Sequence, residues 1–182
     1  MLTLYFAPGS SSFAVHIALR EIGVPFEGKP MSFRSNDLRS PAYLVLNPEG
    51  KVPTLIIDGC PLTEVAAILY YLAKRFPDAE LLPRDDIEAD AQALSWMSFA
   101  ASSLHPARRR GLEHAKEVWG IADRRLGSGW ALARYSIADI LAVRQFAQAC
   151  ARNFPEPHRP LCAHDGPSRR ATNDRYRISD RI

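Results

Sequence analysis

The chain has 182 residues, 47% of them hydrophobic and 24% charged, so it is long enough to bury a core as one large domain or two small ones. No apolar run approaches the roughly 18 residues of a membrane span, and the segment from Met1 to Phe6 lacks the basic region of a signal peptide. We therefore expect a cytoplasmic protein that does not enter a membrane. The formal net charge is +3, of which +2 falls in residues 156–182, so the nearly neutral body offers no basic surface for nucleic acid.

The cysteines and histidines give no sign of a metal or redox centre. Cys60, Cys150 and Cys162 are an odd number without C-x-x-C spacing, which argues against a disulfide framework, a zinc site and a dithiol pair. The five histidines are scattered, and no acidic cluster accompanies them. We expect no bound metal.

Residues 1–77 alternate between strand and helix patterns. Hydrophobic periodicity predicts strands at residues 2–6 and 26–33 and a hairpin formed by residues 54–57 and 61–62. It predicts helices at residues 13–22 and 64–75, with a short or irregular helix at residues 37–46 between them. Gly23 and Pro25 end the first helix. The order βαβαββα is that of an α/β thioredoxin-like domain, in which the parallel crossover between the first two strands should be right-handed.

The strand signal disappears from residue 85 onward. After a proline-containing linker at residues 78–84, apolar residues recur at helical spacing in residues 87–103, 112–126 and 137–152. They predict an all-α helical bundle over residues 85–155. Ser136 and Asp139 have the spacing of a capping box, in which Ser136 caps the amide of Asp139 and Asp139 reaches back to the amide of Ser136.

The most informative segment is Asn47-Pro48-Glu49-Gly50-Lys51-Val52-Pro53, followed by Thr63-Glu64 at the start of a helix. Pro53 has no N–H and precedes a strand, and a cis Val52–Pro53 bond would turn the main chain of Val52 outward, where it could pair with an extended peptide. This order resembles the glutathione-binding half of the glutathione transferases. The capping box, Ser136-Ile137-Ala138-Asp139, also matches that family.

The resemblance implies the glutathione transferase fold, which is a thioredoxin-like domain followed by a helical bundle. It also implies that glutathione is the cosubstrate and that Lys51, Val52 and Pro53 belong to its binding site.

A transferase must hold the sulfur of glutathione as a thiolate, because the thiolate is the reactive form. Residues 5–12 align with the beta-class pattern Y-x-x-P-G-x-C-S so that Ser11 falls at the cysteine position. Ser11 is therefore the first candidate for the hydroxyl that faces the sulfur, and Ser12 the second, although each could equally be a plain helix cap. Tyr5 is the rival donor, since other transferase classes use a tyrosine there, and its alternative role is packing.

The resemblance also assigns the γ-glutamyl end of glutathione. The N-terminus of the helix near Glu64 is an anion site for the carboxylate, and Glu64 can bind the ammonium group. The family usually has a serine next, whereas Val65 keeps only the N–H, which predicts binding weaker by roughly 1.5 to 3 kcal/mol unless Thr63 compensates. His105 lies where bacterial beta-class relatives have a histidine near glutathione, although a lone histidine often only packs or caps.

We expect from this resemblance a bacterial, beta-like cytosolic glutathione transferase. It would join the thiolate of glutathione to a hydrophobic electrophile lodged between the two domains, and it would form a two-fold homodimer. The alternative from another class is a non-catalytic binding module with the same fold, which Val65 and the absence of a cysteine near the first helix favour. A glutathione-dependent isomerase or dehalogenase is a third possibility.

The family pattern stops at Phe154-Pro155. Residues 156–182 contain three further prolines and no helical period, a composition typical of disorder. Codons for this segment can be chosen so that the reading frame one base later encodes N-L-T-A-H-Y and then A-R-M-M-A-R-P-A-V-Q-R-T-I-A-I. This hidden peptide resembles the family's next helix, which has the pattern N-L-x-A-H-Y-x-R-M-x-x-R-P-A-V. We hypothesise that the tail is a frameshift product whose missing helix leaves apolar surface exposed, and the nucleotide sequence decides this.

Overall fold

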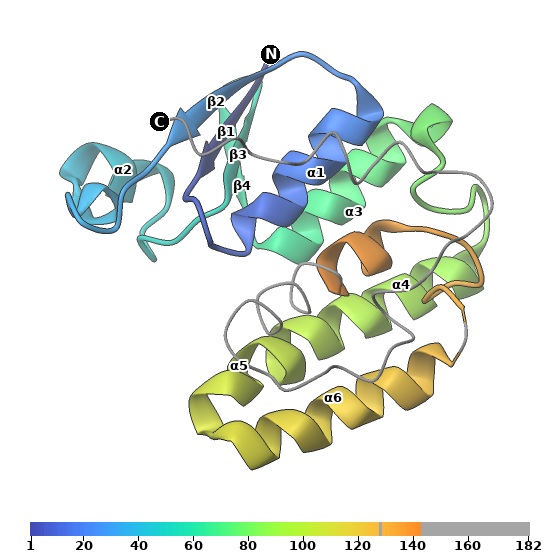
Figure 1. The fold of residues 1–182 in the computed structure, drawn as a ribbon. Helices are drawn as coiled ribbons and strands as arrows, with labels where there is room; N and C mark the ends of the chain where they lie inside the picture. Colours follow the sequence, from blue (N-terminus) through green and yellow to red (C-terminus); the bar gives the residue numbers. More distant parts are fainter. Residues whose placement is uncertain (128, 143–182) are drawn as a thin grey trace.

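A computed structural model describes residues 1–127 and 129–142, and an α/β part and a helical part lie against each other in it (Figure 1). The α/β part contains a four-stranded sheet with strand order β2-β1-β3-β4. Its elements are β1 (Leu2–Phe6), α1 (Ser12–Ile22), β2 (Phe26–Pro30), η1 (Asp37–Arg39), α2 (Pro41–Leu46), β3 (Thr54–Ile57), β4 (Cys60–Thr63) and α3 (Val65–Arg75). The predicted βαβαββα order and the thioredoxin-like fold are confirmed.

The pairing of the strands fixes what lies at each end of the sheet. β1 runs parallel to β2 and antiparallel to β3, and β3 and β4 form a hairpin. α1 and α3 cover one face of the sheet, and α2 lies beyond the other (Figure 1). The prediction that β2 continues to residue 33 is wrong. The strand ends at Pro30 because its partner β1 ends at Phe6, and the last hydrogen bond between them is from the Met31 N–H to the Phe6 carbonyl at 2.7 Å.

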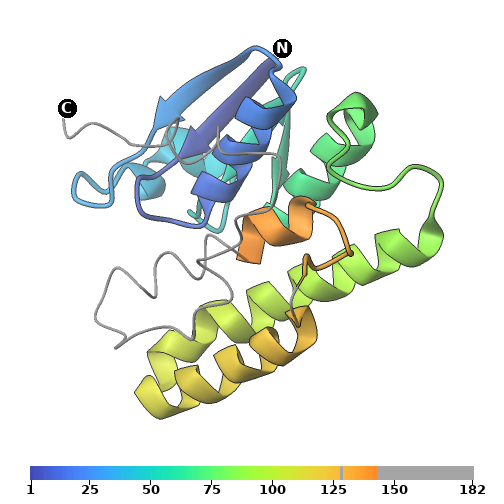
Figure 2. The ribbon, with the colours of Figure 1, turned by 45° about the vertical axis from the view of Figure 1, so that its right-hand side comes forward.

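The helical part is built around two long helices that run side by side (Figure 2). After η2 (Pro77–Ala79) come α4 (Ile87–Phe99), η3 (Ala100–Leu104), α5 (His105–Ala107), η4 (Arg108–Arg110) and α6 (Leu112–Leu126). A further helix begins at residue 137. Residues 143–155 of the predicted bundle and the tail of residues 156–182 lie outside the described residues.

The expected continuous helix over residues 87–103 is wrong in one respect. α4 ends at Phe99, and the five residues of η3 form a π-helical turn, so that the His105 N–H donates to the Ala100 carbonyl. A π-turn inserts one extra residue per turn, which shifts the side chains that follow around the helix axis. Periodicity of apolar residues does not reveal such an insertion.

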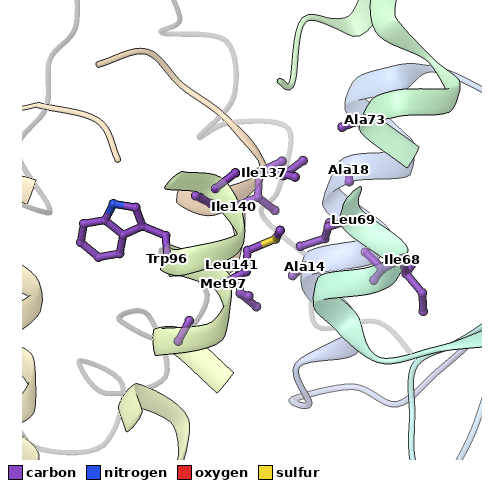
Figure 3. Close-up of a cluster of buried hydrophobic side chains, with 14 of the residues drawn as sticks. Ala14, Ala18, Ile68, Leu69, Ala73, Trp96, Met97, Ile137, Ile140 and Leu141 are labelled. Carbon is purple, nitrogen blue, oxygen red and sulfur yellow. The ribbon is translucent and has the colours of Figure 1, made fainter. Parts of the chain in front are cut away.

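One apolar core joins the two parts (Figure 3). Ala14 of α1 and Leu69 of α3 face Met97 of α4, and all three side chains are fully buried. The small side chain of Ala14 lets α1 pack closely, and burial of each large apolar side chain stabilises the fold by about 1.5 to 3 kcal/mol. Trp96 and Met97 are buried in this core, and Phe99 is partly buried against it.

Polar contacts cross the same interface. The Tyr70 hydroxyl of α3 donates to Asp90 of α4 at 3.2 Å, and the Lys74 ammonium lies 2.6 Å from the same carboxylate oxygen. The Tyr135 hydroxyl donates to Glu21 of α1 at 2.8 Å. The two parts are therefore held in one arrangement by both apolar and directional contacts.

The predicted capping box is present and buried. Asp139 accepts from the Ser136 N–H at 2.9 Å and the Ser136 hydroxyl at 2.8 Å, and its other oxygen accepts from the Ala131 N–H at 2.9 Å. The Ser136 hydroxyl accepts from the Ala138 N–H at 3.3 Å, and not from the Asp139 amide as expected. Burial raises the pKa of the Asp139 carboxyl, while these hydrogen bonds oppose the rise.

Candidate functional site

Three chain segments meet at one end of the sheet. β1 ends there and leads to the start of α1, and the pairing of Tyr5 with Thr54 brings the segment before β3 beside it. The pairing of Thr54 with Thr63 then brings the start of α3 next to that segment. Two helix N-termini and the loop before β3 therefore converge, which gathers unpaired N–H groups and positive partial charge in one place.

The loop before β3 presents an open main chain. The Val52–Pro53 peptide bond is cis, which is the form considered in the sequence analysis. Within the described residues, the N–H and C=O groups of Val52 make no hydrogen bond. Unpaired main-chain groups of this kind can accept an extended peptide as if it were an added strand.

A buried polar network lies under this loop, and sequence reasoning missed it. The Tyr43 hydroxyl of α2 donates to the Lys51 carbonyl and lies 2.9 Å from the Thr54 hydroxyl. The Asn47 amide donates to the same carbonyl at 2.8 Å and accepts from the Glu49 N–H at 3.1 Å. Asn47 stood in the quoted motif, but nothing in the sequence linked Tyr43 to it. The network holds the residue before Val52 by its carbonyl.

Glu64, at the start of α3, has an unusual backbone. Its φ is 69° and its ψ is 121°, whereas Asn36 and Glu80, which also have positive φ, lie in the ordinary left-handed region. A non-glycine residue held in such a conformation costs on the order of 1–3 kcal/mol, and such residues cluster at functional sites. No side chain caps this helix and its first turn has no acidic residue, so its N–H groups are open to an anion.

The charges around the loop are mixed. Lys51 is exposed and its ammonium lies 2.6 Å from Glu49. This hydrogen bond and the Glu49 charge, followed by the Glu64 charge, raise the pKa of Lys51. The Glu64 carboxylate itself forms no hydrogen bond or ion pair with another described residue, which leaves it open to a cationic group.

The serines at the start of α1 differ from one another. The Ser12 hydroxyl is fully buried, accepts from the Ala7 N–H at 3.1 Å and lies 2.6 Å from the Ser10 hydroxyl. The Ser10 hydroxyl accepts from the Ser12 N–H at 3.2 Å, so Ser10 supplies the local cap. Ser11 occupies the N-cap position, and its hydroxyl makes no hydrogen bond with the described residues. Of the predicted pair, Ser11 is the one with an open hydroxyl.

Tyr5 and His105 belong to elements other than α1. The Tyr5 ring lies 5.5 Å from the ring of Tyr43, centroid to centroid, and so packs on the α2 face of the sheet rather than on the α1 face. Its hydroxyl makes no hydrogen bond with the described residues. His105 is half-buried at the start of α5, whose main contacts are with η3, η4 and α6.

Two kinds of feature are missing from the described part of the chain. Residues 1–127 and 129–142 contain no group of three or more histidine, cysteine or acidic side chains suited to hold a metal ion. In the same residues, every helix is too short or too polar to cross a membrane.

Comparison with known proteins gives a consistent picture. Residues 1–74 match the family model for the glutathione S-transferase N-terminal domain. The chain is 32% identical to the bacterial beta-class glutathione S-transferase of Sphingomonas chungbukensis, with 84% of this chain and 85% of that chain covered and a TM-score of 0.72. The chain belongs to the glutathione S-transferase family. A sphingomonad family member solved in complex with glutathione is also 32% identical, over 80% of this chain and 81% of that one, with a TM-score of 0.70.

Sequence relatives in this family align over a shorter region. Glutathione S-transferase GstA of Escherichia coli O157:H7 is 36% identical over 106 residues, which cover 57% of this chain and 53% of that protein. The chain thus spans about half the length of the transferases it matches in this way. Maleylacetoacetate isomerases are also among its relatives.

Proposed function

We propose that the protein is a glutathione transferase, which conjugates the thiolate of glutathione to a hydrophobic electrophile. The observation that carries this proposal is the convergence of three open groups at one end of the sheet. These are the main chain of Val52, the N-terminus of α3 beside Glu64, and the hydroxyl of Ser11. The glutathione bound in a related structure supports the choice of ligand.

Each part of glutathione has a matching group. The peptide backbone of glutathione pairs with the main chain of Val52 next to Pro53, with Lys51 beside it. The γ-glutamyl carboxylate binds the N–H of Val65 at the start of α3, and the adjacent ammonium group binds the open carboxylate of Glu64. Since charged hydrogen bonds are stronger than neutral ones, this end of the ligand contributes most to affinity.

The sulfur lies at the start of α1 in this proposal. The Ser11 hydroxyl donates a hydrogen bond to the thiolate, and the N-terminal end of α1 adds favourable potential. Both effects favour the charged form of the sulfur and so lower the pKa of the bound thiol. We assign no direct role to Ser12, whose hydroxyl is used inside the turn, and we keep for His105 the place near glutathione that the family resemblance implies.

The partners follow from the same proposal. A small hydrophobic electrophile binds between the α/β part and the helical part. An isologous homodimer is supported by α4, which exposes Ile87, Ala91 and Leu94 along one side, with 76% of Ile87 and 45% of Leu94 exposed. Sedimentation of the full chain tests the dimer.

An assay with a chlorodinitrobenzene as electrophile tests the reaction. We expect turnover that saturates with glutathione and falls in the Ser11→Ala variant. Saturable glutathione binding with no conjugation of any electrophile in a panel would instead support the non-catalytic binding module. The isomerase reading, which the maleylacetoacetate isomerase relatives favour, predicts conversion of maleylacetoacetate without consumption of glutathione.

A further inference from the structure

A hollow of about 490 Å³ opens between the C-terminal half of α1 and the edge strand β2. Its walls include Phe6, His16, Leu19, Arg20, Phe26 and Gly28. This volume is in the range of about 300 to 1,000 Å³ typical of small-molecule sites. The hollow shares no residue with the candidate glutathione site.

The sequence leaves this space unfilled at two glycines. α1 stops at Gly23, whose φ of 75° ends the helix, and Pro25 then turns the chain into β2. Gly28 lies in the middle of β2 and has no side chain to cover the wall. A Cβ atom there would lie 3.4 Å from the ring of Phe6 and 3.9 Å from the ring of Phe26, in ordinary contact with both.

Three rings form an aromatic wall. The His16 ring centroid lies 5.2 Å from that of Phe6 and 5.4 Å from that of Phe26, with interplanar angles of 58° and 86°. The His16 imidazole makes no hydrogen bond with the described residues. Burial, and then the charge of Arg20, lower the pKa of His16, so that near neutral pH the ring has one donor and one acceptor nitrogen.

The only charge on the described wall is positive. The Arg20 guanidinium lies 5.4 Å from the centre of the Phe26 ring and forms no ion pair with the described residues. No acidic side chain lines the hollow among those residues. A planar guanidinium next to aromatic rings suits a planar carboxylate, which it binds with two parallel hydrogen bonds.

We propose that this hollow is a second ligand site, which binds a planar aromatic carboxylate. The aromatic ring of the ligand packs against Phe6, His16 and Phe26, and its carboxylate pairs with Arg20. Binding here is independent of glutathione, because the two sites have no residue in common.

Calorimetric titration of the full chain with 2-naphthoate tests the proposal. We expect saturable binding of one 2-naphthoate per chain, unchanged when glutathione is present. The Arg20→Met variant should bind it at least about tenfold more weakly, since a hydrogen bond to a charged group is lost. Arg75→Met is the matched control, because Arg75 also lies 5.4 Å from a phenylalanine ring, that of Phe76, but outside the hollow.

Two further measurements make the outcome unambiguous. Gly28→Leu should abolish 2-naphthoate binding by filling the hollow, with a melting curve to check that the variant folds, and neutral 2-naphthamide should bind more weakly than 2-naphthoate. The proposal is overturned by an absence of saturable binding, by displacement of 2-naphthoate with glutathione, or by equal loss in the Arg20 and Arg75 variants.

Discussion

Ser11 and Ser12 are neighbours at the start of α1, but their hydroxyls have opposite surroundings. The Ser12 hydroxyl is inside the turn and accepts from the Ala7 N–H, whereas the Ser11 hydroxyl has no partner among the described residues. The alignment of residues 5–12 with the beta-class pattern gave both serines a possible role at the sulfur of glutathione. Only the hydrogen bonds separate the two, because the sequence does not say which of three consecutive hydroxyls turns inward.

Alanine substitutions should therefore have different effects at the two serines. Ser11→Ala should raise the apparent pKa of the bound glutathione thiol and slow conjugation, with stability within about 0.5 kcal/mol of the parent. Ser12→Ala should lower stability by about 1 to 3 kcal/mol, because the buried Ala7 N–H loses its acceptor. Thiolate absorbance against pH and urea unfolding measure the two effects. A larger shift in thiol pKa from Tyr5→Phe than from Ser11→Ala would contradict the assignment of Ser11.

Val65 is the residue at which this chain departs from the usual family pattern. The Val65→Ser variant should bind glutathione about tenfold more tightly or better, since the new hydroxyl can add a charged hydrogen bond to the γ-glutamyl carboxylate. Val65→Ala is the control, because it shortens the side chain without adding a hydroxyl. Calorimetry measures both. If Val65→Ser binds no better than Val65→Ala, Val65 does not limit the affinity.

Among the elements, α2 supports the loop that carries Val52. The Tyr43→Phe variant keeps the ring that packs on Tyr5 but loses the hydrogen bonds to Lys51 and Thr54. We expect a loss of stability of about 0.5 to 1.5 kcal/mol. We also expect the KM for glutathione to rise by a larger factor than the factor by which kcat changes, and steady-state kinetics measures both. Tyr71→Phe is the control, since the Tyr71 hydroxyl has no hydrogen bond with the described residues, and an equal KM effect there would contradict a role for the network.

The helix that begins at residue 137 depends on its capping box. Replacing both partners, Ser136→Ala with Asp139→Ala, removes the hydrogen bonds to the amides of Ala131 and Ala138. Stability should fall by about 1 to 3 kcal/mol while the KM for glutathione stays the same. Urea unfolding gives the value, with Ser98→Ala on the exposed side of α4 as the control. A midpoint within error of the parent would show that the box does not stabilise the fold.

Most elements could be predicted because their signals are local. Strand β1 and helix α6 have the predicted bounds, since alternation and helical spacing depend only on nearby residues. The end of β2 at Pro30 and the π-turn at Ala100 were not predicted. The end of β2 depends on where its pairing with β1 ends, and the π-turn depends on packing around α4. A local sequence pattern reveals neither of them.

For the whole molecule, the sequence predicted two domains but not how they meet. The contact of Ala14 and Leu69 with Met97 involves residues more than 25 positions apart, and each was recognisable only as apolar. In the candidate site, the sequence indicated the motif residues of the loop before β3 but not the polar network under that loop. The motif was recognised by its resemblance to a family, whereas the hydrogen bonds that hold the loop became visible only in the fold.

The central claim is that the end of the sheet where α1, α3 and the loop before β3 converge binds glutathione. Calorimetric titration of the full chain with glutathione tests this most directly. We predict saturable binding of one glutathione per chain, weakened in Glu64→Gln, because the amide loses the charge that pairs with the ligand's ammonium group. The Glu88→Gln variant on the exposed start of α4 should bind as the parent does. Absence of saturable binding, or equal affinity in the Glu64 and Glu88 variants, would contradict the account.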